Sequence, residues 1–146
     1  MNIVTLDFET YYAKDYGLKK LTYEEYIADA RFEVIGVAVQ VNDGEPEWFS
    51  GNKEDTYNWL TQFDLENNAV LMHNAMFDAS ILAFHFDIYP KIILDTLCMA
   101  RALHGAIVGG SLKALAQYYD VGEKGEEVHN FIGYTRSMFT PEELES

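Results

Sequence analysis

The chain has 146 residues, of which 49% are hydrophobic and 14% aromatic, and this apolar content excludes an intrinsically disordered protein. Its formal net charge of −14 argues against a general nucleic-acid-binding module, because such modules depend on Lys and Arg contacts to phosphates. Bound divalent cations would reverse that charge locally. The sequence has no stretch of membrane-spanning length and no secretory leader, and its single cysteine, Cys98, allows no internal disulfide. We therefore expect a cytoplasmic protein without a membrane partner.

The first half of the chain predicts a β-hairpin unit accompanied by helices. In chain order we expect a buried strand over 3–8, a helix over 21–28, a long strand over 33–41, a turn over 42–45, a returning strand over 47–50 and a helix over 52–63. Within the last helix, Tyr57, Leu60 and Phe63 recur at helical spacing, which predicts that they share its buried face.

The second half alternates strands with helices. We expect a strand over 69–72, a helix over 77–86, a strand over 92–94, a helix over 96–103 and a helix over 112–119 with Ser111 as its N-cap. Thr140-Pro141-Glu142-Glu143 then has the N-cap, first-turn proline and acidic residues that begin a further helix. A hairpin unit followed by β-α-β-α predicts the α/β class, with a mixed sheet flanked by helices. No linker divides residues 1–146, so we expect a single domain.

Two carboxylates on the first strand are the first candidates for chemistry. Asp7 and Glu9 are two residues apart, so their side chains point to the same face of the sheet, and oxygen ligands of this kind suit Mg²⁺ or Mn²⁺. The same spacing occurs at Asp43-x-Glu45 and Asp64-x-Glu66, but there it lies in polar, turn-like sequence. The pair on the first strand is distinguished by its apolar surroundings, where unpaired charge is costly.

A third carboxylate follows a second buried strand. The run His73-Asn74-Ala75-Met76-Phe77-Asp78 opens a helix and places Asp78 in its first turn, where the helix dipole favours an anion. If the two strands are neighbours, their ends bring Asp78 towards Asp7 and Glu9. Asp95, which also follows a strand, is better suited to capping the next helix than to binding a metal.

Together these segments resemble the ribonuclease H-like DEDD superfamily of 3′–5′ exonucleases. Asp7-Phe8-Glu9-Thr10 is similar to its first motif, and residues 73–78 are similar to its second. The runs 94–101 and 111–116 resemble the sequence that follows in proofreading domains of family A DNA polymerases, especially those of phages. The similarity extends from residue 3 to about residue 120.

The resemblance implies a two-metal site for Mg²⁺ or Mn²⁺ ions that hydrolyses phosphodiester bonds. By motif position, Asp7 would bridge both ions, Glu9 would bind the ion that activates water, and Asp78 would serve the second ion through water.

The resemblance also implies a substrate and its contacts. Thr10 and Asn74 would line the pocket for the terminal nucleotide, and Phe8 and Phe77 would stack or pack beside it. The expected substrate is a single-stranded DNA 3′ end. A polymerase domain or a complementing chain is the expected protein partner, in the host cytoplasm if the protein is phage-encoded.

The third motif of the superfamily, Tyr-x-x-x-Asp or His-x-x-x-x-Asp, has no convincing match. Three pairs come near the required spacing: Tyr11 with Asp15, His73 with Asp78, and Tyr119 with Glu123. The helix that begins near Pro141 is where the resemblance would place this motif, so we expect the domain to be truncated before its last helix. A fragment, a split enzyme completed by another chain and a domain that no longer catalyses all fit, and we expect weak or absent activity of this chain alone.

Two other functions fit the same motifs. The chain could act on RNA 3′ ends, because the fold and the first two motifs are shared with exoribonucleases. Alternatively, it could be a catalytically inactive interaction domain that binds a polymerase.

Overall fold

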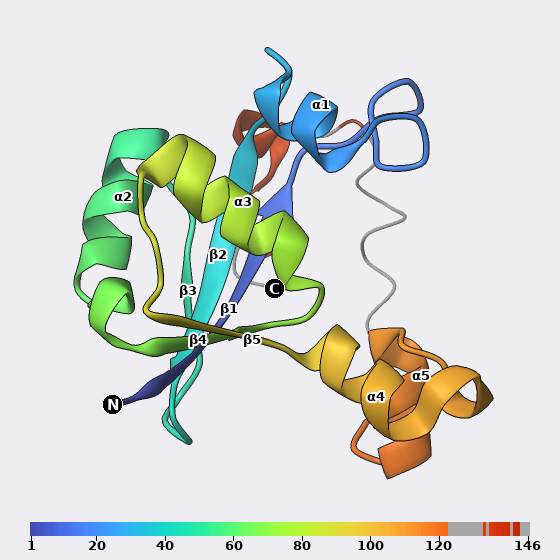
Figure 1. Ribbon diagram of the computed structural model, residues 1–146. Coiled ribbons are helices and arrows are strands. Elements are labelled where there is room, and N and C mark those ends of the chain that lie inside the picture. Colours follow the sequence, from blue (N-terminus) through green and yellow to red (C-terminus); the bar gives the residue numbers. More distant parts are fainter. Residues whose placement is uncertain (123–132, 134, 141, 144–146) are drawn as a thin grey trace.

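A five-stranded mixed sheet forms the centre of the structure, a computed structural model that describes residues 1–122, 133, 135–140 and 142–143. Its strands lie in the order β3-β2-β1-β4-β5 (Figure 1). They are β1 (Ile3–Thr10), β2 (Val34–Val41), β3 (Glu47–Phe49), β4 (Ala69–Met72) and β5 (Ile92–Asp95). β1, β2 and β3 pair antiparallel, whereas β4 pairs parallel with both β1 and β5. The predicted mixed sheet of the α/β class is therefore confirmed.

Helices complete the order of elements. They are α1 (Tyr23–Ala28), α2 (Lys53–Thr61), α3 (Ala75–Phe86), α4 (Thr96–Val108) and α5 (Leu112–Tyr119), with short 3₁₀ turns η1 (Leu65–Asn67) and η3 (Arg136–Met138). α2 and α3 lie on the same side of the sheet, while α4 and α5 stand beside it (Figure 1). None of the helices within the described ranges is both long and apolar enough to cross a membrane.

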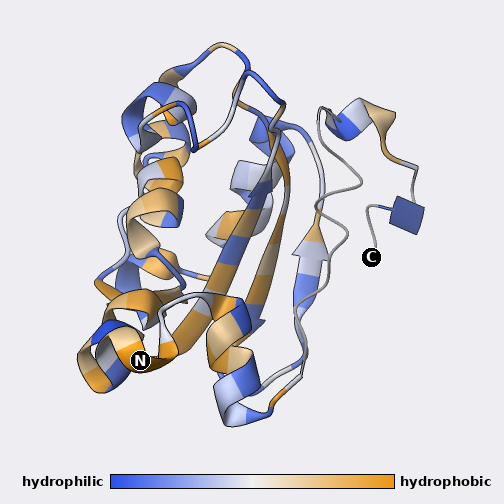
Figure 2. Ribbon diagram, turned by 90° about the vertical axis from the view of Figure 1, so that its right-hand side faces the viewer, coloured by the Kyte–Doolittle hydropathy of each residue, from blue (hydrophilic) through white to orange (hydrophobic). Residues whose placement is uncertain are grey.

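Alternation along β1 decides which face of the sheet carries the core. Val4, Leu6 and Phe8 are buried, at 0%, 2% and 4% exposure, whereas Asp7 and Glu9 between and after them are exposed. Because side chains alternate in a strand, the two carboxylates lie on the face opposite the core. The C-terminal segment lies on the other side of the sheet from the main group of helices (Figure 2).

Several predicted element boundaries were wrong. Leu60 is buried and Phe63 is partly buried against the core, as predicted, but Tyr57 is 42% exposed and Thr56 is buried instead. α4 continues to Val108, but Gly105 has the non-helical φ of 59°, which breaks the helix into two pieces. Ser111 caps α5 as predicted, since its side chain accepts a hydrogen bond from the Ala114 main-chain N–H at 3.1 Å.

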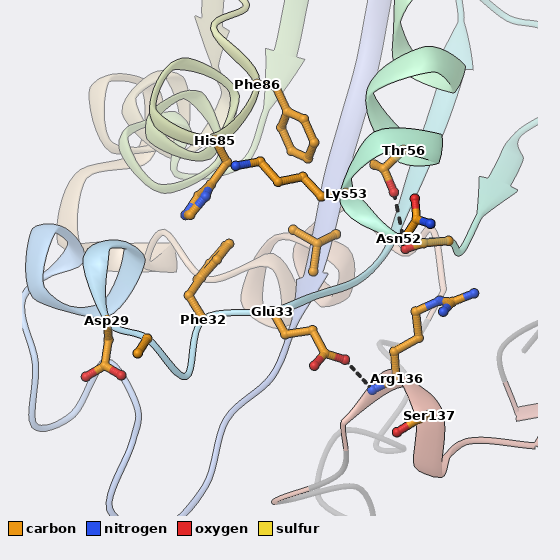
Figure 3. A pocket seen from close by; sticks show the side chains of 13 residues that line it. Asp29, Phe32, Glu33, Asn52, Lys53, Thr56, His85, Phe86, Arg136 and Ser137 are labelled. Carbon is orange, nitrogen blue, oxygen red and sulfur yellow. Dashed lines mark hydrogen bonds between the residues drawn. The ribbon is translucent and has the colours of Figure 1, made fainter.

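Arg136 fastens the C-terminal segment to the ends of β2 and β3. Its main-chain N–H donates to the Glu33 carboxylate (Figure 3). Its guanidinium donates to the Ser50 hydroxyl at 3.0 Å and to the Ser50 carbonyl at 3.3 Å. Further on, Thr140 and Glu143 exchange the two hydrogen bonds of a capping box, as expected where a helix begins. The rest of the helix predicted from Pro141, and Glu123 of the near-miss third motif, lie outside the described residues.

Candidate metal-binding site

Asp7 and Glu9 lie side by side at the end of β1 on the exposed face of the sheet. Their partners on β2 are Ala38 and Gly36, two small residues, and the pairing shifts register directly after Glu9. The core residues Leu6 and Phe8 fix the strand from the opposite face. The sequence therefore presents both carboxylates to solvent from a rigid strand, where a cation can reach them.

Asp78 reaches the same strand from the first turn of α3. Its side chain is only 3% exposed, and its Oδ1 accepts a hydrogen bond from the Phe8 main-chain N–H at 3.2 Å. Burial, followed by the negative charges of Asp7, Glu9 and Asp95, raises the pKa of Asp78 to about 7. The predicted convergence of Asp78 with the β1 carboxylates is thus observed in the geometry, across 70 residues of sequence.

The donor set fits a hard divalent cation in part. Carboxylate oxygens are the ligands that Mg²⁺ and Mn²⁺ take, and the repulsion that raises the pKa of Asp78 is what a cation would relieve. Within the described ranges, however, no three His, Cys, Asp or Glu side chains are grouped so that they could hold a metal ion together. Asp7 and Glu9 are the exposed pair, and buried Asp78 fits an indirect role behind them.

Asp95 holds the turn from which α3 starts. Asn74, which precedes α3, has the left-handed φ of 63° and makes no side-chain cap of its own. Instead, Asp95 Oδ1 accepts hydrogen bonds from the main-chain N–H groups of Asn74, at 3.0 Å, and of Leu97, at 2.9 Å. One carboxylate therefore fixes the starts of both α3 and α4. The capping role expected of Asp95 is present, and its link to α3 is an addition that the sequence did not reveal.

Replacing Asp95 with Ala should destabilise the protein and loosen the start of α3. Loss of the α4 N-cap costs about 0.5–2 kcal/mol, and the Asn74 N–H before α3 loses its acceptor as well. Urea unfolding should show a lower midpoint with an unchanged m value. Asp55→Ala is the matched control, because Asp55 is an exposed first-turn residue of α2 that is not the cap. Equal stability of Asp95→Ala and wild type would contradict the assigned role.

Three of the four predicted substrate-contact residues are linked to one another through α1. The Thr10 hydroxyl hydrogen-bonds the Tyr26 hydroxyl at 2.8 Å, and the Asn74 side-chain amide donates to the Tyr23 hydroxyl at 2.5 Å. The Phe77 ring lies 5.6 Å from the Tyr23 ring and 5.8 Å from the Tyr26 ring. Thr10, Asn74 and Phe77 are thus joined through two tyrosines of α1.

Phe8 requires a correction. Its ring is 4% exposed and stacks on Phe86 in the core, with centroids 6.0 Å apart. The physical reason is strand alternation: residue 8 must point away from the face that carries residues 7 and 9. Phe8 is therefore a packing residue and not a substrate contact.

Tyr12 and the two α1 tyrosines are site residues that the sequence did not predict. Burial, and then the charge of Glu9, raises the pKa of the Tyr12 hydroxyl, and the same charge contributes to the raised pKa of Tyr26. Tyr12 follows Glu9 closely in sequence, so proximity was the available signal for it. For Tyr23 and Tyr26 the sequence held no signal, because α1 reaches β1 only through the tertiary fold.

A separate cavity lies elsewhere on the molecule. A cavity of about 560 Å³ is bounded by the end of α1, the start of β2, the start of α2 and the end of α3, and by Arg136 (Figure 3). Its walls include Lys53, His85 and Glu33, but not Asp7, Glu9 or Asp78. The carboxylate site therefore lies on an exposed face of the sheet and not in this cavity.

Solved nuclease structures share this fold at low sequence identity. NrnC of Brucella melitensis bound to pGG matches with a TM-score of 0.64 at 16% identity, over 98% of this chain and 63% of that one, and an NrnC structure with bound Mg²⁺ matches with 0.62. RNase D of Escherichia coli, an exoribonuclease, matches with 0.61 at 12% identity, over 98% and 34%. The family B DNA polymerase of Pyrobaculum calidifontis matches with 0.53 at 16% identity, over 84% and 19%.

The chain thus spans less than two thirds of the length of each of these structures. No protein-family model and no curated protein sequence matches it. What the structural matches establish is a ribonuclease H-like α/β fold, which confirms the fold expected from the sequence.

Proposed function

We propose that this chain is a metal-dependent 3′–5′ exonuclease domain of the proofreading type, acting on single-stranded DNA 3′ ends. The observation that supports it most is the buried Asp78 carboxylate, held on the Phe8 main-chain N–H between the charges of Asp7 and Glu9. A buried acid whose ionisation is opposed by neighbouring acids is typical of functional sites and is unfavourable as a purely structural feature.

Each carboxylate has a separate role in this proposal. Asp7 and Glu9 would hold two Mg²⁺ or Mn²⁺ ions directly from β1, and Asp78 would act through a water molecule because it is buried. The bound cations would supply Lewis-acid stabilisation of phosphate charge and a lowered pKa for the attacking water. Positive charge at this face would also offset the net charge of −14, which otherwise repels a nucleic acid.

Thr10, Asn74 and Phe77 would orient the terminal nucleotide. Hydrogen bonds to Tyr26 and Tyr23 fix the Thr10 hydroxyl and the Asn74 amide, and this preorganisation reduces the entropy lost on binding. Tilted contacts to the same tyrosines hold the Phe77 ring, whose apolar surface can pack against a base. The proposed pocket therefore rests on α1 as well as on the two motifs.

The proposal predicts slow, metal-dependent release of nucleotides from single-stranded 3′ ends. A low rate is expected because, among the described residues, no group of three or more His, Cys, Asp or Glu side chains could hold a metal ion. Labelled DNA oligonucleotides incubated with Mn²⁺ and resolved by length should shorten from the 3′ end, and Asp7→Ala should abolish the shortening. Brisk release would contradict the expected low rate, and release that is unchanged in Asp7→Ala would contradict the assigned site.

RNA is the second candidate substrate, because NrnC is bound to pGG in one matching structure and RNase D is an exoribonuclease. RNA and DNA oligonucleotides of the same sequence separate the two candidates in the same assay. Faster shortening of DNA supports the proofreading type, and faster shortening of RNA replaces it with an exoribonuclease. A chain that binds Mn²⁺ but shortens neither would fit a polymerase-associated domain that does not catalyse alone.

A further inference from the structure

Two hydrogen-bond donors are buried without a partner among the described residues: the Tyr12 hydroxyl and the Trp48 indole N–H. Buried polar groups are almost always paired in folded proteins, so each exception calls for an explanation. The two residues belong to different elements and are 36 positions apart in the sequence. Both nevertheless lie beside Glu9.

Trp48 lies on the same face of the sheet as Asp7 and Glu9. In β3, Trp48 pairs with Ala38 of β2, and Ala38 pairs with Asp7 of β1. Paired residues of antiparallel strands point to the same face. The indole extends over Gly36, where an added Cβ would lie only 2.2 Å from the ring atom Cζ2. Since Gly36 pairs with Glu9, the indole covers the strip of sheet next to the Glu9 carboxylate.

Tyr12 approaches from the other direction, just past the end of β1. The Tyr11 main-chain N–H donates to the Glu33 carbonyl at 2.9 Å, and the Tyr12 carbonyl accepts from the Gly133 N–H at 2.6 Å, so the backbone is fixed on both sides. Burial, and then the charge of Glu9, raises the pKa of the Tyr12 hydroxyl, which opposes ionisation. At neutral pH the phenol keeps its proton and remains available as a donor.

We propose that the Tyr12 hydroxyl and the Trp48 indole N–H donate hydrogen bonds to phosphate oxygens of the nucleotide bound at Asp7 and Glu9. This inference rests on the proposed exonuclease function. Neutral hydrogen-bond donors are compatible with a position next to Asp7 and Glu9. A Lys or Arg there would form ion pairs with the two carboxylates and compete with the metal. Phosphate oxygens are acceptors, which matches an indole that can only donate and a phenol that retains its proton.

The test uses the reaction product, a nucleoside 5′-monophosphate, which the protein cannot consume. Mn²⁺ alone is titrated first, and then dGMP and GMP are titrated in its presence into the full chain and into Tyr12→Phe and Trp48→Phe. Tyr57→Phe and Trp59→Phe on α2 are the matched controls for the same ring changes. Thermal unfolding of each variant reports whether the substitution alters the fold, and guanosine without phosphate reports contacts to the base alone.

Tyr12→Phe should bind Mn²⁺ and guanosine as wild type does, but should bind the monophosphate roughly ten-fold more weakly, as expected when a hydrogen bond to a charged group is lost. Its melting temperature should be equal or higher, because an unpaired buried hydroxyl is removed. Trp48→Phe should weaken monophosphate binding in the same way, while both α2 variants should leave it unchanged.

Three results would overturn the inference. If Tyr12→Phe and Trp48→Phe bind the monophosphate like wild type, the donors do not contact phosphate. If Tyr57→Phe weakens binding as much as Tyr12→Phe, the effect belongs to the fold. A wild-type protein that binds neither Mn²⁺ nor monophosphate would remove the proposed function itself. If wild type binds both and either of the first two results is found, the proposed function stands and only the role of the two donors fails.

Discussion

Replacing Asp78 with Asn should make the metal-free protein more stable at pH 8, while leaving its stability at pH 4 nearly unchanged. The pKa of Asp78 rises from its ordinary value of 3.8 to about 7 in the fold, so the folded state holds a proton that the unfolded state has released. The free energy of unfolding therefore falls as pH rises from about 4 to about 7. The asparagine of the variant cannot ionise, and its side-chain oxygen can still accept from the Phe8 N–H.

A shift of this size corresponds to roughly 4 kcal/mol at pH 8, as an order of magnitude. The measurement is urea unfolding of wild type and variant between pH 4 and pH 8, and the quantity of interest is the difference between the two proteins. Asp55→Asn is the control, because Asp55 occupies the first turn of α2 but is exposed. Adding Mn²⁺ at pH 8 should stabilise wild type and reduce the difference. A variant less stable than wild type at pH 8 would contradict the account.

The sheet could be predicted because its strands are strongly apolar or turn-bounded. Residues 69–72 are all apolar and form β4 over the predicted residues, and Asn42 adopts the left-handed φ of 49° expected in a turn between β2 and β3. Alternation along β1 placed Asp7 and Glu9 on one face without any tertiary information. The order of neighbouring strands was not determined by the sequence pattern, but the parallel pairing of β1 with β4 is what the proposed convergence required.

The buried face of α2 was only partly predicted, because Thr56 and not the larger Tyr57 is buried one turn before Leu60. Thr56 is buried, and its hydroxyl donates a hydrogen bond to the Gly51 carbonyl at 3.4 Å. The Tyr57 side chain is 42% exposed to solvent. Periodicity alone cannot distinguish these two alternatives.

The carboxylates of the candidate site could be predicted from the sequence, whereas the residues that hold the neighbouring side chains in place could not. Asp7, Glu9 and Asp78 follow from strand alternation and from the position of a helix start. The Asp95 carboxylate that anchors Asn74, and the tyrosines of α1 that hold Thr10 and Asn74, depend on contacts across 16 to 51 residues of sequence. Such contacts leave no local pattern. The packing role of Phe8, by contrast, follows from the same alternation that places its neighbours at the surface.

If Asp7 and Glu9 form a divalent metal site, calorimetric titration with Mn²⁺ should detect it. Wild type should bind Mn²⁺, and Asp7→Ala should lose at least roughly ten-fold in affinity, since one of two exposed carboxylate ligands is removed. Asp43→Ala is the matched control, because Asp43-x-Glu45 has the same spacing in an exposed turn. Asp43→Ala should bind Mn²⁺ as wild type does. No Mn²⁺ binding by wild type, or equal binding by wild type and Asp7→Ala, would contradict the proposed metal site.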